Sequence, residues 1–332
     1  MPALLTRMSS LPNICIVRAT IVFASSSFDT SALITRGFLS YLAHSEATFA
    51  SFSSFLPTRV TSAPSLANCI AVTAPIPSLA PVTITTLLAK LILNGASSGI
   101  GAAAAILFAK EGADLTIVGR DDAKLAKVAE DCGKFGKKPL IISADVTKDD
   151  EVTAIVEQTI KVFGKLDVLI NNAGMIKPDD ISHPSFMQIF DAIMNTNMRA
   201  VAVLTNLAAP HLKATKGSIV NVSSVAATQV SMPRFASYKT SKAALNHFTR
   251  CVALELAPHG VRVNSISPGP VSTDLFDRAG MSTALTVLKQ ATALDRVSDP
   301  EEIAEMILHL ASDKAKGVTG SEYVIDNGIL LK

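Results

Sequence analysis

The chain has 332 residues with a formal net charge of +2, and 48% of its residues are hydrophobic. That length supplies enough material for one large domain or two ordinary domains. The balanced charge argues against a nucleic-acid-binding surface and against an acidic partner. No uninterrupted apolar run reaches the roughly 18–20 residues of a membrane span, since Arg18 breaks the best candidate. The four scattered cysteines lack disulfide or metal spacing, so we expect a cytoplasmic protein without a bound metal.

Residues 1–86 differ in composition from the rest of the chain. They are rich in Ser, Thr, Ala and Pro, and their only acidic residues are Asp29 and Glu46. An acid-poor, Ser- and Arg-containing N-terminus resembles an organelle transit peptide, and a flexible tail is the simpler alternative. A third interpretation, from the genetic code, fits this segment better than either.

When a gene is read on its opposite strand, with the first two bases of each codon facing each other, Gly codons become Pro codons and Val codons become Thr codons. Read backwards from Thr83 in this way, the N-terminal segment closely matches Leu93–Ile106 in one constant register, with Pro81 facing Gly95. We therefore predict that residues from about 11 to 83 are the antisense translation of a related, inverted gene copy. We expect the whole extension to be disordered and without function.

The domain proper is expected at 87–332, where short apolar runs alternate with amphipathic segments. This pattern predicts a doubly wound α/β fold, in which a single domain has one parallel sheet with helices on both faces. The first strand, at about 88–93, runs into Asn-Gly-Ala-Ser-Ser-Gly-Ile-Gly at 94–101, and a helix follows to about 111.

The glycines of this turn allow a tight bend and close approach of a ligand. The helix that follows offers free N–H groups and its positive dipole end to a pyrophosphate. The glycine spacing differs from the usual dinucleotide fingerprint but serves the same purpose. The candidate cofactor-binding residues here are Gly95, Ser97, Ser98, Gly99, Ile100 and Gly101.

The second strand, 114–118, ends in Gly119, Arg120 and Asp121. At this strand end an acidic residue binds the adenosine ribose hydroxyls of NAD, whereas a nearby Arg accommodates the 2′-phosphate of NADP. Gly119 leaves room and Arg120 brings positive charge, so we predict a preference for NADP(H), with NAD(H) as the alternative. Asp121 is the competing signal, but it begins the next helix, where an acidic residue is ordinary capping.

Two more strands are expected at 140–144 and 168–170, each after a helix. Polar and small residues follow both strands. Such residues at the carboxyl ends of parallel strands are suited to a ligand crevice, although Asn-Gly corners also form ordinary turns. The further cofactor-binding candidates are Asp145, Val146, Asn172, Ala173 and Gly174.

Four more motifs follow in order along the chain. They are Met194-Asn-Thr-Asn-Met198 on a long helix, Ser223-Ser224 after the strand 218–222, Tyr238-Lys-Thr-Ser-Lys242, and Asn264-Ser-Ile-Ser-Pro-Gly-Pro-Val-Ser-Thr273. Together with the glycine turn, these motifs resemble those of the short-chain dehydrogenase/reductase family, in particular its 3-oxoacyl-carrier-protein-reductase-like members. The resemblance covers residues 88–328. It departs at Asn94, where the family usually has Thr.

The pair Tyr238 and Lys242 carries the predicted chemistry. The two residues lie four apart on a segment that is helical to about Leu256, so they share one face. Carbonyl reduction needs a hydride from nicotinamide and a proton for the developing alkoxide. A free tyrosine has a pKa near 10. We expect the Lys242 ammonium to lower the pKa of Tyr238 toward neutrality, which makes Tyr238 the acid/base.

The family resemblance implies roles for further residues. Lys242 would also hold the nicotinamide ribose, Ser224 would hydrogen-bond the substrate oxygen, and Asn197 would complete a proton relay through water to Lys242. Strand alternation lets only one of Ser223 and Ser224 face the site, and Ser224 best matches the family spacing. After the strand 261–267, the residues expected beside the nicotinamide are Pro268, Gly269, Val271 and Thr273.

Residues 274–296 are expected to form a lid over the substrate. Its side chains are apolar and small, which hints at a hydrophobic substrate, although core packing of a lid helix explains them equally well. A helix over 300–311 follows, with Asp299 as its cap, and a strand at 323–325 completes the sheet.

We therefore predict an NADP(H)-dependent oxidoreductase that interconverts a ketone and a secondary alcohol. The alternative is a dinucleotide-binding regulator or scaffold without turnover, which would not need a proton donor. The resemblance also implies a homotetramer built through the helices that carry Asn197 and Tyr238. Steroids, acyl thioesters, sugars and retinoids all remain open as substrate classes.

Overall fold

The computed structural model describes residues 89–230 and 232–332, so the predictions for the extension 1–86 lie outside the described residues. The described chain builds a seven-stranded sheet in the order β3-β2-β1-β4-β5-β6-β7. Every neighbouring pair of strands is parallel. This arrangement confirms the doubly wound α/β prediction.

The element boundaries agree closely with those expected from the hydrophobic pattern. The strands are β1 (Lys90–Asn94), β2 (Asp114–Gly119), β3 (Leu140–Ser143), β4 (Val168–Asn171), β5 (Ser218–Val222), β6 (Arg262–Pro268) and β7 (Glu322–Ile325). The helices are α5 (Gly99–Lys110), α6 (Asp122–Gly133), α7 (Asp149–Phe163), α8 (Phe186–Met194), α9 (Ala200–Thr215), α10 (Ala236–Leu256), α11 (Leu275–Arg278), α12 (Ala284–Ala291) and α13 (Pro300–Ala311). Strands β4 and β5 are buried at every residue, as parallel strands covered on both faces require.

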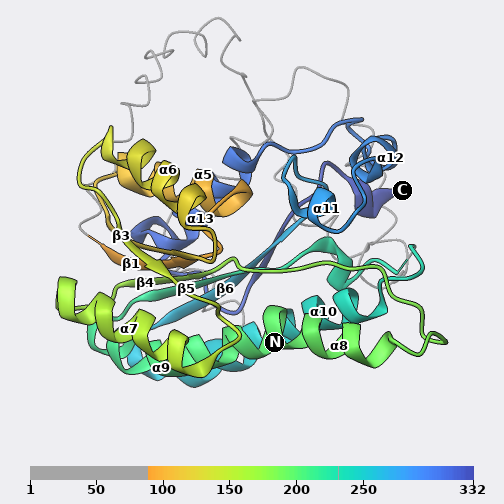
Figure 1. The fold of residues 1–332 in the computed structure, drawn as a ribbon. Coiled ribbons are helices and arrows are strands. Elements are labelled where there is room, and N and C mark those ends of the chain that lie inside the picture. Colours follow the sequence, from red (N-terminus) through yellow and green to blue (C-terminus); the bar gives the residue numbers. More distant parts are fainter. Residues whose placement is uncertain (1–88, 231) are drawn as a thin grey trace, which may run out of the picture. The chain divides into compact units, whose positions relative to one another are not determined.

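Helices cover both faces of the sheet (Figure 1). Helices α5, α6 and α13 lie on one face, and α7, α9 and α10 lie on the other. One buried cluster, which includes Phe108 and Ile307, fills the first interface. A second cluster, which includes Ile155 and Leu204, fills the other. None of the helices in the described part of the chain combines the length and apolarity needed to cross a bilayer.

The strand order reverses between β1 and β4, which are hydrogen-bonded neighbours although two strands separate them in sequence. From β1 the chain moves outward through β2 to β3, and it returns to pair β4 on the other side of β1. Ligands of open α/β sheets bind in the crevice at the carboxyl ends of the strands at such a reversal. The glycine turn follows β1 and Asn172–Gly174 follow β4, so the topology brings these two predicted segments together.

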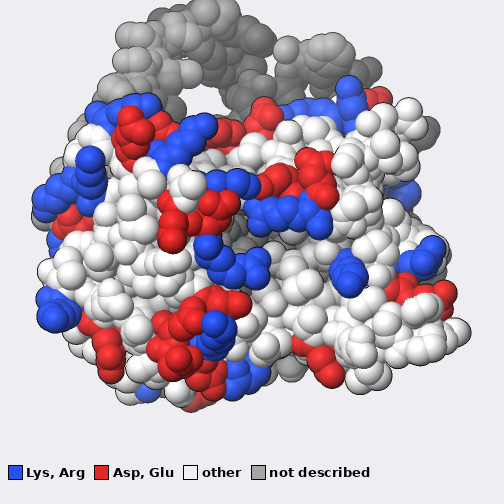
Figure 2. Space-filling view, in the orientation of Figure 1, with Lys and Arg blue, Asp and Glu red and all other residues white. Residues whose placement is uncertain are grey.

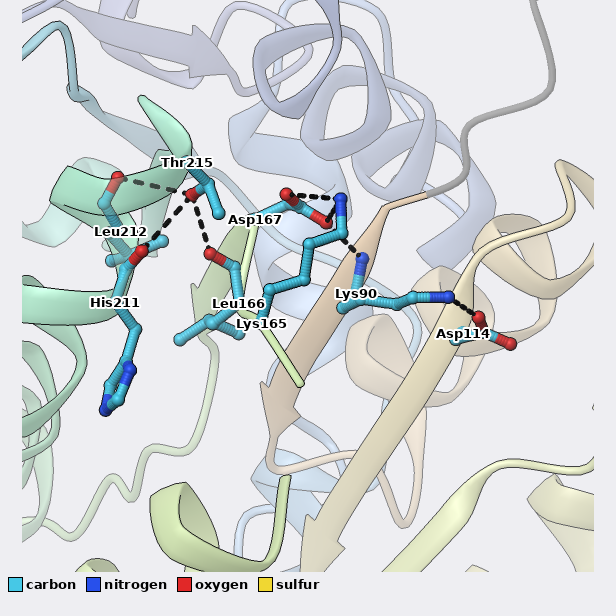
Figure 3. A network of polar contacts seen from close by, with 8 residues as sticks. All are labelled: Lys90, Asp114, Lys165, Leu166, Asp167, His211, Leu212 and Thr215. Atoms are coloured by element: carbon cyan, nitrogen blue, oxygen red, sulfur yellow. Dashed lines mark hydrogen bonds and ion pairs between the residues drawn. The ribbon is translucent and has the colours of Figure 1, made fainter. Parts of the chain in front are cut away.

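The amino ends of the strands, opposite the crevice, are held by polar contacts (Figure 3). The Lys90 amide donates to Asp167 Oδ2 at 2.7 Å, and its ammonium pairs with Asp114 at the start of β2. The Thr215 hydroxyl donates to the Leu166 carbonyl at 2.7 Å. These contacts join the amino ends of β1, β2 and β4 to the end of α9, so the first strand is anchored near the point where the described residues begin.

Candidate active site

One cavity of about 460 Å³ lies at the carboxyl ends of the strands. Its wall contains Ser224, Tyr238 and Lys242, and nearly all of the predicted cofactor-binding residues also line it. The lining members of that set are Gly95, Ser97, Ser98, Gly99, Ile100, Arg120, Asp145, Val146, Asn172, Ala173, Gly174, Pro268, Gly269, Val271 and Thr273. Two predicted residues, Gly101 and Asn197, are not among the residues that line it. Acidic and basic side chains are interspersed over the face of the molecule in Figure 2.

The glycine turn is packed too closely for side chains. Gly99 has φ +54°, and a Cβ there would lie 2.8 Å from the Thr273 side chain. At Gly101 a Cβ would lie 2.2 Å from the Gly95 carbonyl oxygen and 2.6 Å from Asn172 Nδ2. Gly101 therefore lets α5 begin against the turn and against the segment after β4, which aims the first N–H groups of the helix at the cavity.

Asn94, the residue that departs from the family pattern, holds the turn to the segment after β4. Its Oδ1 accepts hydrogen bonds from the amides of Asn172 at 2.8 Å and Ala173 at 2.6 Å. Its Nδ2 donates to Asn171 Oδ1 at 3.0 Å. Asn171 in turn donates to Asn221 Oδ1 at 2.9 Å. These buried amides form a chain across β1, β4 and β5, in which each polar group has a partner.

Arg120 and Asp145 line the end of the cavity formed by β2 and β3. Burial acts to raise the pKa of Asp145, but hydrogen bonds from Thr147 and the positive charge of Arg120 outweigh it and hold that pKa below its usual value. Asp121 caps α6, since its side chain accepts from the Lys124 amide at 3.0 Å. This contact confirms the capping interpretation of Asp121.

The lid closes over the glycine turn through Asp274, which the sequence interpretation did not single out. Ser98 Oγ donates to Asp274 Oδ1 at 3.0 Å, and Lys124 Nζ lies 3.2 Å from Asp274 Oδ2. Arg278 also pairs with this carboxylate. Ser98 and Asp274 are 176 residues apart, so no local pattern could have predicted the contact. The lid is formed by α11 and α12, whose Phe276 and Leu288 pack with Val225 and Ile329.

Tyr238 and Ser224 meet in the cavity. Tyr238 lies in the first turn of α10 and is 8% exposed. The Tyr238 and Ser224 side chains both line the cavity, and Ser224 Oγ accepts a hydrogen bond from the Ala226 amide at 3.1 Å. Ser223 points the other way, because its hydroxyl donates to the carbonyl of Lys242 at 3.2 Å. The alternation along the chain therefore supports Ser224, and not Ser223, as the serine beside the phenol.

Lys242 lies one turn after Tyr238 on the same buried face of α10. Its ammonium donates to the Val222 carbonyl at 2.8 Å and lies 5.8 Å from the centre of the Tyr238 ring. Burial lowers the pKa of Lys242 from 10.5 to about 8. The ammonium therefore lies close to both the end of β5 and the phenol. Its pKa is near physiological pH.

The expected direction of the Tyr238 pKa is wrong for this structure. Burial raises the pKa of the phenol, and the neighbouring Ser224 hydroxyl offsets only part of that effect. The Lys242 ammonium does not reverse the shift, because it is directed at the Val222 carbonyl and is itself desolvated. The helical spacing predicted the proximity of the two groups correctly, but the direction of the Tyr238 pKa shift depends on burial.

The long helix expected around Asn197 is interrupted at that residue. Helix α8 ends at Met194, a π-helical turn spans Asn195–Arg199, and α9 continues from Ala200. The Asn197 side chain lies in this turn and is fully buried. It accepts from the Met175 amide at 2.8 Å and donates to the Met175 carbonyl at 2.9 Å. π-Turns of this kind are frequent at functional sites.

Asn197 also donates to Ser241 Oγ at 3.0 Å on α10. A Cβ on Gly174 would lie 3.5 Å from Asn197 Oδ1 and 3.7 Å from Lys242 Nζ. Both side chains therefore lie next to Gly174, at distances that an added Cβ would tolerate. The Asn197–Ser241 contact links two predicted motifs that lie 44 residues apart.

Comparison with known proteins agrees with this geometry. The family model described as enoyl-(acyl carrier protein) reductase matches residues 95–330. The chain is 37% identical over 247 residues to a 3-oxoacyl-(acyl-carrier-protein) reductase of Thermotoga maritima, which covers 72% of this chain and 97% of that protein. It is 36% identical over 244 residues to an A-factor type gamma-butyrolactone 1′-reductase of Streptomyces virginiae, with coverage of 72% and 95%.

A solved structure shows the same fold. A short-chain dehydrogenase/reductase of unknown function from Caenorhabditis elegans, determined with cofactor, aligns with a TM-score of 0.69 at 38% identity. The alignment covers 73% of this chain and 94% of that one. With its motifs gathered at the strand reversal and relatives of this similarity, the chain belongs to the short-chain dehydrogenase/reductase family of NAD(P)(H)-binding oxidoreductases.

Proposed function

We propose that the protein is an NADP(H)-dependent enzyme that interconverts a ketone and a secondary alcohol. The observation that carries this proposal is the convergence of Ser224, Tyr238 and Lys242 in a single cavity that also contains Arg120 and the glycine turn. A binding module needs no buried phenol beside a serine hydroxyl, whereas proton delivery to an alkoxide needs a proton donor of this kind.

The residues present fit a dinucleotide. The glycine turn has no room for side chains at Gly99 and Gly101, and the amino end of α5 opens onto the cavity between β1 and β4. Ser97–Ile100 would hold the pyrophosphate, Asp145 and Val146 would border the adenosine, and Asn172–Gly174 would border the nicotinamide ribose with Lys242. The remaining contacts of the nicotinamide would come from Pro268, Gly269, Val271 and Thr273. When bound, the cofactor supplies or accepts the hydride.

Tyr238 is the proton donor and acceptor of this reaction. Tyr238 and Ser224 both line the cavity, and the Ser224 hydroxyl is close enough to act on the pKa of the phenol, so both hydroxyls can bond the same substrate oxygen. Burial keeps Tyr238 protonated, which suits a donor to an alkoxide. Lys242 lies close enough to stabilise the phenolate after proton transfer. Asn197 would carry the proton onward through water, a role supported by its position across Gly174 from Lys242.

The preference for NADP(H) over NAD(H) is supported by the charge at the end of β2. Arg120 is exposed at the rim of the cavity, and the preceding residue is Gly119. Asp121, the acidic residue nearby, is engaged with the Lys124 amide as a helix cap. A guanidinium binds a phosphate by charge-assisted hydrogen bonds, and the acidic group on which the Arg120 charge acts here is Asp145.

The substrate side of the cavity favours an apolar ketone. Its wall contains the lid residues Leu275, Phe276, Met281 and Leu288. Predominantly apolar walls with a few polar groups are typical of small-molecule sites. The two polar hydroxyls at Tyr238 and Ser224 would orient the carbonyl, while the lid would cover the rest of the molecule.

We also propose a homotetramer in the cytoplasm, with the catalytic domain at 87–332. A groove on α8 and α9 is bordered by Met194 and Met198, and Leu254 on α10 is 80% exposed. Half-buried methionines and an exposed leucine on these helices suit a subunit interface. Light scattering of the purified protein would give the mass of the assembly.

The cysteines also support the proposed location in the cytoplasm. Cys132 and Cys251, the cysteines among the described residues, are free thiols, which supports a reducing compartment.

The proposal is tested by following nicotinamide absorbance with NADPH and with NADH against a panel of ketones, using the full chain. We expect turnover with NADPH that Tyr238→Phe abolishes, since this variant removes only the hydroxyl. Turnover with NADH alone would keep the enzyme and reject the cofactor preference. Cofactor binding without turnover on any ketone would favour a regulator instead.

A further inference from the structure

The helix that carries Tyr238 and Lys242 is not capped by its own sequence. Phe235 is the N-cap residue of α10 and makes no side-chain hydrogen bond to the helix. The first N–H groups of any helix have no partner within the helix, and an uncapped first turn frays readily. Tyr238 is the third residue of α10, so an opening of this turn would displace the phenol.

A distant carboxylate takes the place of the missing cap. Asp179 Oδ1 accepts from the Ala236 amide at 2.9 Å, and Oδ2 accepts from the Ser237 amide at 2.7 Å. Asp179 is 3% exposed and reaches α10 from 57 residues away in the sequence. Both oxygens are used, on the two residues immediately before Tyr238.

The backbone around this carboxylate is also fixed. The Asp179 amide donates to the carbonyl of Arg234 at 2.8 Å. Arg234 has φ +67°, a conformation that residues other than glycine rarely adopt. Such strain persists only where neighbouring contacts hold it. The chain therefore enters α10 along a path that the loop carrying Asp179 determines.

The same loop begins at the cofactor side of the cavity. Residues 172–176 line the cavity after β4, and the Asn197 side chain holds Met175 by both its amide and its carbonyl. Three residues later, Pro178 restricts the backbone directly before Asp179. The segment 175–179 is thus held at one end by Asn197 and at the other by the start of α10.

We propose that Asp179 is a positioning residue for Tyr238. Its buried carboxylate fixes the first turn of α10 and so sets the phenol beside Ser224, at a defined distance from the segment that borders the nicotinamide. This inference rests on the proposed reductase function. Displacements of about 1 Å from a productive geometry can cost a hundredfold in rate, so a cap at this position acts on catalysis as well as on the helix.

The first test is hydrogen–deuterium exchange of the full-length protein, which needs no substrate. In Asp179→Ala, the amides in a peptide spanning 235–242 should exchange at least about tenfold faster, because the loss of a helix cap raises the population of the open turn by roughly that factor. The matched control is Asp180→Ala, which removes the neighbouring, exposed carboxylate. Unchanged exchange in Asp179→Ala would overturn the inference whatever the activity.

The second test separates positioning from a general loss of stability. Asp179→Ala should lower kcat about tenfold or more, while the Kd for NADPH from fluorescence titration changes less than about twofold. Asp179→Asn retains one acceptor oxygen and should fall between Ala and the wild type. Ile307→Val, a buried change in α13 at a residue that does not line the cavity, serves as a destabilised control that keeps its kcat.

The outcomes distinguish this inference from the proposed function. A kcat for Asp179→Ala equal to that of Ile307→Val would overturn the positioning role and leave the reductase assignment intact. A wild-type enzyme inactive on every ketone would instead refute the proposed function, and the exchange measurement alone would then decide whether Asp179 anchors the turn that carries Tyr238.

Discussion

The contacts of Asn94 allow a quantitative prediction for the cofactor turn. The substitution Asn94→Val keeps the size of the side chain roughly constant but removes all of its hydrogen bonds. Two partly buried backbone amides, at Asn172 and Ala173, lose their acceptor, and the buried Asn171 Oδ1 loses a donor. Each buried polar group left without a partner costs about 1–3 kcal/mol. We therefore expect Asn94→Val to lower the free energy of unfolding by about 2–4 kcal/mol, after partial relaxation of the turn.

The informative comparison is with Asn94→Thr, which has the shape of Val and a hydroxyl that can accept from the same amides. Thr should be more stable than Val by about 1–3 kcal/mol, and the melting temperature of the Val variant should lie roughly 4–16 °C below that of the wild type, at about 2–4 °C per kcal/mol. Urea unfolding followed by circular dichroism measures the first quantity, and a thermal scan measures the second. Equal stability of the Thr and Val variants would refute the argument that these hydrogen bonds stabilise the turn.

Three further changes test other parts of the site. Arg120→Ala should lower kcat/KM for NADPH relative to NADH by about tenfold, because one charge-assisted hydrogen bond to the 2′-phosphate is lost; steady-state kinetics with an unchanged ratio would reject Arg120 as the determinant. Gly101→Ala should reduce stability by about 1–3 kcal/mol and weaken NADPH binding, measured by fluorescence titration, because its Cβ would overlap the Gly95 carbonyl. Lys242 has its pKa lowered from 10.5 to about 8 by burial, so the folded state binds fewer protons than the unfolded state between these values. The free energy of unfolding of the wild type relative to Lys242→Met should therefore rise by about 3 kcal/mol as pH increases through this window; a difference independent of pH in urea titrations would contradict the burial of the charge.

The sequence by itself predicted the architecture and most of the residues that line the cavity. Alternating apolar runs and amphipathic segments predicted the strands and helices closely, because burial on both sides of a parallel sheet imposes that pattern. The four-residue spacing of Tyr238 and Lys242 predicted their shared face, since helical periodicity is a local property. The cap at Asp121 was equally local. Each of these inferences needed only neighbours along the chain.

Only the tertiary structure decided the interactions that cross between distant segments. The raised pKa of Tyr238 follows from burial, which depends on how the helix packs. The Asn197 side chain in the π-turn binds the backbone of Met175, 22 residues earlier. Asp274 and Asp179 reach their partners across even longer separations. A hydrogen bond between remote residues leaves no periodic pattern in the sequence, because its donor and acceptor come together only after the sheet has formed.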